Sequence, residues 1–185
     1  MSIGYDLLAL YCSQVLANIK PSNLFTISNT AYEVDKLIET WNKDFNKYGI
    51  YFQVLTKREN TSSILCFRKD LLQKSLSYEK TKCFLKNCGY DTSNIASCTR
   101  CLKDRFLENE FPHEIGLILG YPYDDVIGFI ENKGRNYLYS GYWKVYKDKE
   151  DKCKLFNLYN KIRRIYIKAN SNKYKFKKLV EIDTS

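Results

Sequence analysis

Apolar residues recur at helical spacing in the first quarter of the chain. Over residues 8–19 one appears every three or four positions, the period of a helix that buries one face, and Pro21 ends this segment. The same period returns over residues 30–47, and Gly49 then stands where a helix C-cap belongs. We therefore expect two amphipathic helices, with a short strand between them over residues 23–28.

Two runs rich in β-branched and aromatic residues follow. Residues 50–57 and 62–68 are typical of strands, and the turn-forming sequence RENT between them predicts a hairpin. Helical spacing dominates residues 70–133, after which NYLYSGYWKVYK (136–147) is predicted to return to the sheet. Strands in a pair, then a run of helices, then a strand indicate an α+β fold with a small, mainly antiparallel sheet packed with several helices.

The last part of the chain combines a long helix with an alternating segment. Residues 149–169 have helical spacing, and the sequence Asn170-Ser171-Asn172 breaks that helix. The final segment, KYKFKKLVEI, alternates like a strand. We therefore expect a single globular domain over residues 1–169, followed by a basic C-terminal extension over residues 170–185 that forms an edge strand.

Composition indicates a globular protein without a membrane segment. The chain has 185 residues, of which 44% are hydrophobic and 15% aromatic, so it can bury a core of its own. Its N-terminus has no basic segment before an apolar one, and no apolar run approaches the ~18 residues of a membrane span. Seven cysteines at irregular spacing form a poor disulfide framework and suit a reducing compartment. We expect a cytoplasmic protein.

The net charge of +9 is concentrated near the C-terminus. Residues 152–185 contain ten Lys or Arg and two acidic residues, against 20 and 19 in the preceding residues. Three lysines repeat every seven residues, and others alternate with Tyr174 and Phe176, which suits phosphate contacts and base stacking. A solvated helix face and a lysine-protected edge strand explain the same pattern without nucleic acid. The lysines concerned are Lys154, Lys161, Lys168, Lys173, Lys175, Lys177 and Lys178.

The stretch EFPHEIGLILGYPYDDVIGFIENKG (110–134) contains the only histidine, two of the three prolines and four of the eight glycines. It predicts a helical hairpin over residues 112–133, with its corner at Gly120-Tyr121-Pro122. Asp124 and Asp125 then lie near the positive end of the second helix, where carboxylates are favourable. This structure requires no ligand.

Two ligand-binding motifs resemble parts of the same stretch. Its glycines and apolar residues fall at the offsets of a DNA-binding helix-turn-helix, but no basic residue lies between Pro112 and Glu131, and Asp124 and Asp125 would face the phosphates. The sequence HEIGL begins like the zinc-protease motif HExxH. Leu117 takes the place of the second histidine, and because the chain has no other, that motif is excluded.

The pair His113 and Glu114 is the remaining candidate for chemistry in this stretch. A histidine side chain titrates near neutrality and can act with a nucleophile from another part of the chain. Cys12 is the first candidate nucleophile, because a position at a helix start would lower the pKa of its thiol. Alternatively, Cys12 belongs to the apolar face of its helix and is buried.

Four other cysteines raise the question of a metal. Cys83, Cys88, Cys98 and Cys101 have the spacing C-x4-C-x9-C-x2-C, which four zinc or iron–sulfur ligands can have. Cys98 and Cys101 fall within a predicted helix over residues 92–108, without the tight turn of a zinc knuckle. This context favours the interpretation without a metal.

The segment FPHEIGLILGYPYDDVIGFIENKG, followed by GYWKVY and preceded by IKPSNLF, resembles an uncharacterised family of clostridial and related Firmicute proteins, a domain of unknown function. Members carry variants of PHEIGLxLGYPxxDVxGFI and GxWKVY, and the resemblance covers most of the chain. Cys12, His113 and Glu114 match the family's pattern, whereas Gln14 replaces a proline and Cys83, Cys88, Cys98 and Cys101 lie outside it. Because genes of this family often lie near flavodoxin-like genes, the resemblance implies a redox context with a flavodoxin-like partner. It implies no particular activity or cofactor.

Two functions of different class follow. The first is a site for a small molecule or for redox chemistry, formed by Cys12 with His113 and Glu114. The second is a non-catalytic binding protein that contacts nucleic acid or a protein partner through the basic C-terminal helix and tail.

Overall fold

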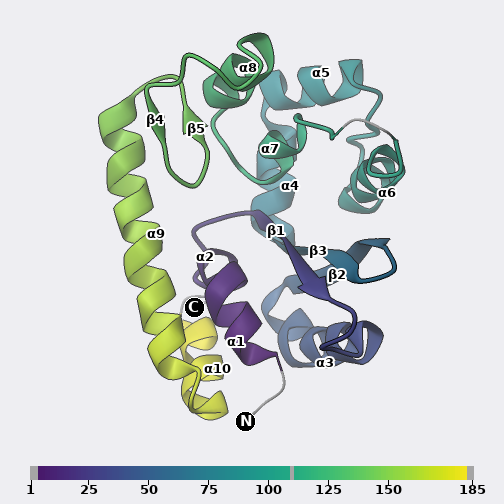
Figure 1. Cartoon of the computed structure of the whole chain (residues 1–185), viewed down its shortest axis with the longest axis vertical. Helices are drawn as coiled ribbons and strands as arrows, with labels where there is room; N and C mark the ends of the chain where they lie inside the picture. Colours follow the sequence, from purple (N-terminus) through teal and green to yellow (C-terminus); the bar gives the residue numbers. More distant parts are fainter. Residues whose placement is uncertain (1–3, 109–110, 183–185) are drawn as a thin grey trace. The chain divides into compact units, whose positions relative to one another are not determined.

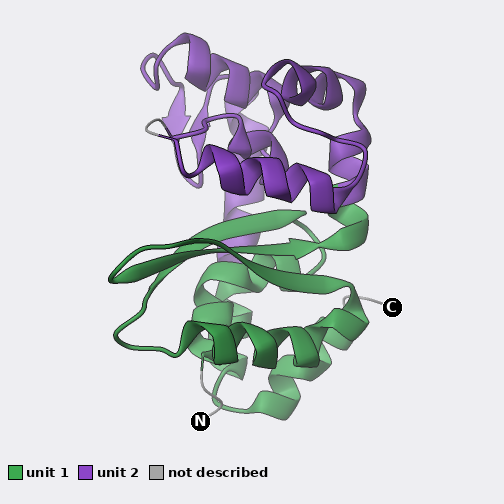
Figure 2. Ribbon diagram, turned by 90° about the vertical axis from the view of Figure 1, so that its right-hand side faces the viewer, with its two compact units in different colours: residues 1–72, 162–185 green, residues 73–161 purple. Residues whose placement is uncertain are grey.

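Residues 4–108 and 111–182 are described by a computed structural model, which confirms the α+β class. The chain divides into two compact units, which are coloured separately in Figure 2. Unit 1 comprises residues 1–72 and 162–185, and unit 2 comprises residues 73–161.

Two helices carry the chain from one unit into the other. They are α4 (Lys69–Ser77) and α9 (Lys149–Ala169), both labelled in Figure 1. None of the helices in the described part of the chain combines the length and the apolar composition that a membrane crossing needs. The expectation of one domain over residues 1–169 concerns cooperative folding and stays a prediction.

Unit 1 begins with three short helical segments, α1 (Tyr5–Leu7), the π-helix η1 (Leu8–Cys12) and α2 (Ser13–Leu16). The predicted helix over residues 8–19 is therefore confirmed in type, but it contains a π-helical turn and ends earlier. Its apolar face is fully buried, as the spacing predicts. The buried residues of this face are Leu8, Cys12, Val15 and Leu16.

A three-stranded antiparallel sheet follows, with the strand order β1-β3-β2. Its strands are β1 (Ser22–Ser28), β2 (Ile50–Lys57) and β3 (Thr61–Arg68), and all three agree with the predicted strands. The predicted hairpin of β2 and β3 is confirmed, with an irregularity in its register between Val54 and Thr56.

Helix α3 (Val34–Phe45) packs on this sheet and continues into the short 3-10 helix η2 (Asn46–Tyr48). Gly49 follows with a φ of 73°, so the predicted glycine C-cap is confirmed. The Asn42 amide fastens α3 to the edge strand β2. Its oxygen accepts from the Phe52 backbone N–H at 2.8 Å, and its nitrogen donates to the Phe52 carbonyl at 2.9 Å.

The core of unit 1 contains side chains from the sheet, the first helical segments, α3 and the C-terminal helices. Figure 2 shows the strands of this unit lying across its helices. Aromatic rings form much of this core, and ring-to-ring contacts link helices that are distant in sequence. They come from Tyr5, Phe25, Trp41, Phe45, Phe52, Tyr166 and Phe176.

Residues Lys173–Ile182 form helix α10, so the prediction of an edge strand there is wrong. Phe176 and Val180 lie about one helical turn apart and are both fully buried, whereas Lys178, which would share their face in a strand, is exposed. Asn172, part of the predicted breaker, instead caps the helix, because its side-chain oxygen accepts from the Lys175 N–H at 3.1 Å. The helix belongs to the core of unit 1 and is no extension.

Unit 2 is mainly helical, as predicted for residues 70–133. After α4 its helices are α5 (Glu79–Asn87), α6 (Ile95–Arg105), α7 (Ile115–Ile118) and α8 (Tyr123–Glu131).

A small hairpin in unit 2 corrects a second expectation. Within the described residues, β4 (Tyr139–Ser140) and β5 (Lys144–Val145) pair only with each other, so residues 136–147 do not return to the three-stranded sheet. The turn of this hairpin instead packs on α9. A Cβ atom on Gly141 would lie 2.3 Å from the Phe156 ring, so only glycine allows this approach.

Candidate ligand-binding site

The helical hairpin predicted over residues 112–133 is confirmed and forms one side of the site. Helices α7 and α8 meet at a corner where Gly120 has a φ of 77°. Pro122 directly precedes α8, one position earlier than expected. A Cβ atom on Gly116 would lie 2.8 Å from Val126 Cγ2, so glycine at this position allows α7 and α8 to pack closely.

Asp125 connects this helical hairpin to the segment GYWKVY. The side chain is buried, and its Oδ2 accepts a hydrogen bond from the Trp143 indole N–H at 2.8 Å. Its Oδ1 accepts from the backbone N–H groups of Tyr146 at 2.7 Å and Lys147 at 3.2 Å. The neighbouring Asp124 is exposed and lies 2.9 Å from the Lys147 ammonium, whose hydrogen bond lowers the pKa of Asp124. Both carboxylates lie in the first turn of α8, as predicted.

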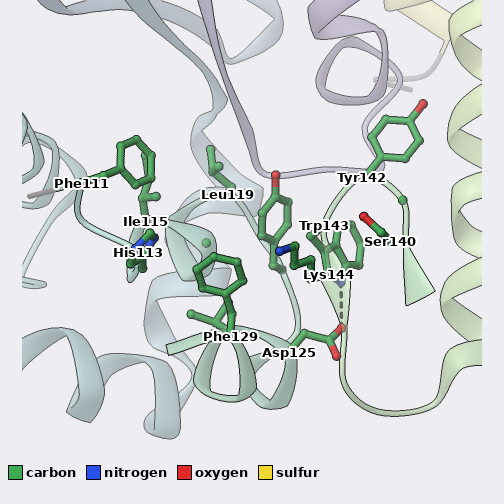
Figure 3. Close-up of a pocket in the computed structure, with 14 residues that line it drawn as sticks. Phe111, His113, Ile115, Leu119, Asp125, Phe129, Ser140, Tyr142, Trp143 and Lys144 are labelled. Atoms are coloured by element: carbon green, nitrogen blue, oxygen red, sulfur yellow. Dashed lines mark hydrogen bonds between the residues drawn. The ribbon is translucent and has the colours of Figure 1, made fainter. Parts of the chain in front are cut away.

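The two segments line a cavity of about 310 Å³ that opens to solvent, shown in Figure 3. Tyr121 and Trp143 form a stacked pair in its wall, with ring centroids 4.6 Å apart. Burial raises the pKa of Tyr121 to about 12, so its hydroxyl stays protonated at neutral pH. The apolar part of the lining comes from Phe111, Ile115, Gly116, Leu119, Val126, Phe129 and Gly141, and the remaining lining residues are His113, Asp125, Ser140, Tyr142 and Lys144.

Two side chains of the lining carry basic nitrogen atoms, His113 and Lys144. The His113 ring is exposed and lies between two phenylalanines, 4.9 Å from Phe129 and 5.6 Å from Phe111 between centroids. The Lys144 ammonium donates to the Gly134 carbonyl at 2.7 Å and lies 5.6 Å from the Phe129 centroid. In Figure 3 the Phe129 ring stands between these two side chains.

Glu114 points to a different set of partners and does not line the cavity. Its Oε1 accepts from the Tyr90 hydroxyl at 3.1 Å and from the Arg105 Nε and Nη2 atoms at 3.0 and 2.9 Å. Burial, and then the nearby charge of Glu114, raise the pKa of Tyr90. Glu114 therefore fastens the start of the helical hairpin to α6.

Cys12 lies in unit 1, at the end of the π-helix, and is fully buried. The pKa of its thiol is raised, first by burial and second by a hydrogen bond with Cys66. The expected lowering of this pKa at a helix start is therefore wrong, and the alternative of a buried apolar face is confirmed. His113 and Glu114 belong to unit 2, so their cooperation with Cys12 stays a prediction.

The four cysteines of the C-x4-C-x9-C-x2-C pattern do not converge. Cys83 is exposed, Cys98 is buried, and Cys88 and Cys101 are half-buried. Within residues 4–108 and 111–182, no three His, Cys, Asp or Glu side chains are grouped so that they could hold a metal ion. In this structure these four thiols are therefore not placed to share one ion.

The fold and the site define an α+β chain with an aromatic cavity in unit 2. Comparison with family models identifies it more closely: residues 8–180 match the family described as "Protein of unknown function (DUF3793)", and the chain belongs to this family. No curated protein and no solved structure matches it significantly. The resemblance to an uncharacterised family is thus confirmed.

Sequence reasoning singled out one residue of the cavity, His113, as a candidate for chemistry. It did not single out Lys144, Trp143, Tyr121 or Phe129. The available signal was that these residues fall inside FPHEIGLILGYPYDDVIGFIENKG and GYWKVY, two segments that the sequence analysis had already singled out. Their shared role needed the contact between Asp125 and the GYWKVY segment, which is separated from it by more than a dozen residues.

Proposed function

We propose that this protein binds a small molecule that combines a flat apolar ring with an acidic group, in the aromatic cavity of unit 2. A volume of about 310 Å³ suits one ring system, since small-molecule sites occupy roughly 300–1,000 Å³. The stacked Tyr121 and Trp143 rings and the Phe129 ring offer surfaces for an aromatic ligand.

Lys144 supplies the preference for an acidic group. An ammonium group has three N–H donors, and among the described residues the Gly134 carbonyl is its hydrogen-bond acceptor. Two N–H bonds remain for a carboxylate or phosphate, and His113 lines the same cavity.

The convergence of two separated segments on one cavity carries the proposal. Residues 111–129 and 140–144 supply the lining among the described residues, and Asp125 joins them, because it accepts one hydrogen bond from Trp143 and two from Tyr146 and Lys147 just after the second segment. A role in folding alone would favour close packing here and not a cavity.

Binding is favoured over acid–base catalysis by the state of the carboxylates. Asp125 is the only carboxylate among the described lining residues, and both of its oxygens already accept hydrogen bonds. Glu114 is held by Tyr90 and Arg105 outside the lining. Asp125 is held by three N–H donors of the chain itself and Glu114 lies outside the lining, so neither carboxylate is placed as a general base toward a ligand in the cavity.

Fluorescence of Trp143 tests the proposal. The chain has two tryptophans, and Trp41→Phe leaves Trp143 as the only one. The Trp41 indole N–H is buried without an acceptor among the described residues, so this substitution breaks no known hydrogen bond. We expect saturable quenching by 4-nitrobenzoate and 4-nitrophenyl phosphate, and weaker binding of the neutral 4-nitrobenzamide.

Two lysine variants separate a specific from a general charge effect. Lys144→Met should weaken binding of both anionic probes by about tenfold or more, the usual effect of one hydrogen bond to a charged group. Lys147→Met removes the same charge from a residue that pairs with Asp124 outside the cavity, and should leave binding unchanged. Linear, non-saturable quenching by all three probes would refute the proposal.

A redox role for Cys12 with His113 and Glu114, beside a flavodoxin-like partner, remains a separate prediction. The buried thiol with its raised pKa argues for slow reaction, because the thiolate is the reactive form. Alkylation of Cys12 between neutral and alkaline pH, in the wild type and in His113→Ala, tests it. Identical pH profiles would end the idea of direct cooperation.

Contact with nucleic acid or protein through the C-terminal lysines also remains a prediction. Lys154, Lys161 and Lys168 are exposed on α9, which supports it. Phe176, expected to stack with bases, is fully buried, and Lys173 and Lys177 form ion pairs with Asp44. Neutralising Lys154, Lys161 and Lys168 together should abolish such binding if it exists.

A further inference from the structure

An exposed segment continues from the lining of the cavity. Residues 135–141 are all exposed, and they include three consecutive large apolar side chains. Tyr137 is 45% exposed, Leu138 55% and Tyr139 41%. A run of exposed apolar residues beside a cavity is typical of an interaction surface. We call residues 133–141 the rim segment.

The rim segment is also basic. Residues 132–149 contain five Lys or Arg and one acidic residue, Asp148. Lys133 and Arg135 are exposed, and the Lys144 ammonium lies 4.9 Å from the Tyr137 ring centroid. The surface therefore alternates positive charge with an exposed aromatic ring.

We infer that the rim segment binds single-stranded nucleic acid, with one base entering the cavity and the phosphates contacting Lys133 and Arg135. This inference rests on the proposed function, because it makes the ring of the ligand a nucleobase and its acidic group a phosphate. Proteins that bind single strands combine a basic track with aromatic rings on which bases stack. Tyr137 offers such a ring, while Tyr139 already stacks on Phe156 at 6.1 Å between centroids.

The cavity distinguishes a single strand from other polyanions. In a duplex the bases are paired and stacked, so none enters a side-chain pocket without the cost of unpairing. An acidic polypeptide offers negative charge, but its carboxylates stand on flexible apolar stems and supply no ring for the Tyr121 and Trp143 walls.

Nearby carboxylates limit where the phosphates can lie. Asp124 is paired with Lys147, and the charge of Asp125 faces three N–H donors. Glu131 and Asp148 are exposed and do not line the cavity. The path with the least repulsion follows Lys133, Arg135 and Lys144.

Fluorescence anisotropy of the full chain with a fluorescein-labelled oligouridylate tests this inference. Its affinity should exceed that of uridine monophosphate, and the affinity should fall as salt rises. The double variant Lys133→Gln/Arg135→Gln removes two phosphate contacts and should reduce the slope of log affinity against log salt by about 1.4. The matched control Lys74→Gln/Lys86→Gln removes the same charge from exposed residues of α4 and α5, outside the rim segment and the cavity lining, and should leave the slope unchanged.

Tyrosine variants test the stacking. Tyr137→Ala should weaken oligouridylate binding about tenfold, whereas Tyr137→Phe keeps the ring and should bind as the wild type does. Tyr174→Ala, at a tyrosine that is 74% exposed on α10, is the control and should have no effect.

The outcomes separate this inference from the proposed function. An oligouridylate that binds no better than the monophosphate, or that polyglutamate displaces as well as unlabelled oligouridylate does, overturns the inference; saturable quenching of Trp143 by the nitrophenyl probes would still support the cavity. An equal change of the slope in both double variants would also overturn the inference, because binding would then depend only on the overall positive charge. If the small probes fail as well, both proposals fall.

Discussion

Asp125→Asn is the most direct test of how the cavity is assembled. The carboxylate accepts two backbone N–H groups on Oδ1 and the Trp143 indole N–H on Oδ2. An asparagine can keep its oxygen toward the backbone donors, but its amide nitrogen then faces the indole N–H, donor against donor. The substitution loses one hydrogen bond to a charged acceptor and weakens two others.

The expected cost follows from those three bonds. Losing one charged hydrogen bond and leaving a buried donor without an acceptor should lower the free energy of unfolding by ~2–4 kcal/mol. In a Trp143→Phe background no indole N–H faces the asparagine amide, so Asp125→Asn should lower the free energy of unfolding by less there. The coupling between the two positions should be ~1–2 kcal/mol.

Urea unfolding followed by far-ultraviolet circular dichroism measures all four proteins of this cycle with one probe. The Asp125→Asn protein should also lose saturable binding of 4-nitrobenzoate, because the position of Trp143 depends on Asp125. An equal cost of Asp125→Asn in both backgrounds would show that the indole hydrogen bond does not hold the cavity together.

Three further predictions test other contacts. Arg105→Ala leaves Glu114 buried without its cation and should lower the free energy of unfolding by ~1–3 kcal/mol, discounted because Arg105 is partly exposed; Glu114→Gln should restore part of the loss. Burial lowers the pKa of Lys20 from its ordinary value of 10.5 to about 7. The unfolded chain therefore binds more protons between these pH values, so the free energy of unfolding should rise with pH in this window. Urea unfolding of Lys20→Met should show a smaller rise in this free energy, by the order of 2 kcal/mol between pH 7 and 9. Gly116→Ala should destabilise by ~1–3 kcal/mol through the 2.8 Å approach to Val126, and a second change, Val126→Ala, should relieve this contact in thermal unfolding.

The elements that sequence predicted well depend on local signals. Gly49 ends α3 with a positive φ, and Pro122 precedes α8, because glycine and proline restrict or permit backbone angles whatever surrounds them. The β2–β3 hairpin likewise follows from two β-branched runs around a short turn. These features need no knowledge of distant residues.

The elements that sequence predicted wrongly depend on distant contacts. In α10 the alternation of lysines with Tyr174 and Phe176 is the same whether the segment is a strand or a helix with one buried stripe. The core of unit 1 decides between them, because it buries Phe176 and Val180 but leaves Lys178, which would share their face in a strand, exposed. The segment over residues 136–147 has strand propensity, but Asp125 and Phe156 hold it against the helices of unit 2.

The sequence by itself determined the α+β class, the helical hairpin with its glycine corner and the positions of Asp124 and Asp125, because periodicity, turn residues and helix ends act over a few neighbouring residues. Only the tertiary structure decided which candidate side chains share a site. It buried Cys12 against Cys66, tied Glu114 to Arg105, and brought Lys144 to the cavity that His113 also lines. These contacts depend on how helices and hairpins pack, and packing is a property of surfaces formed by residues far apart in the chain.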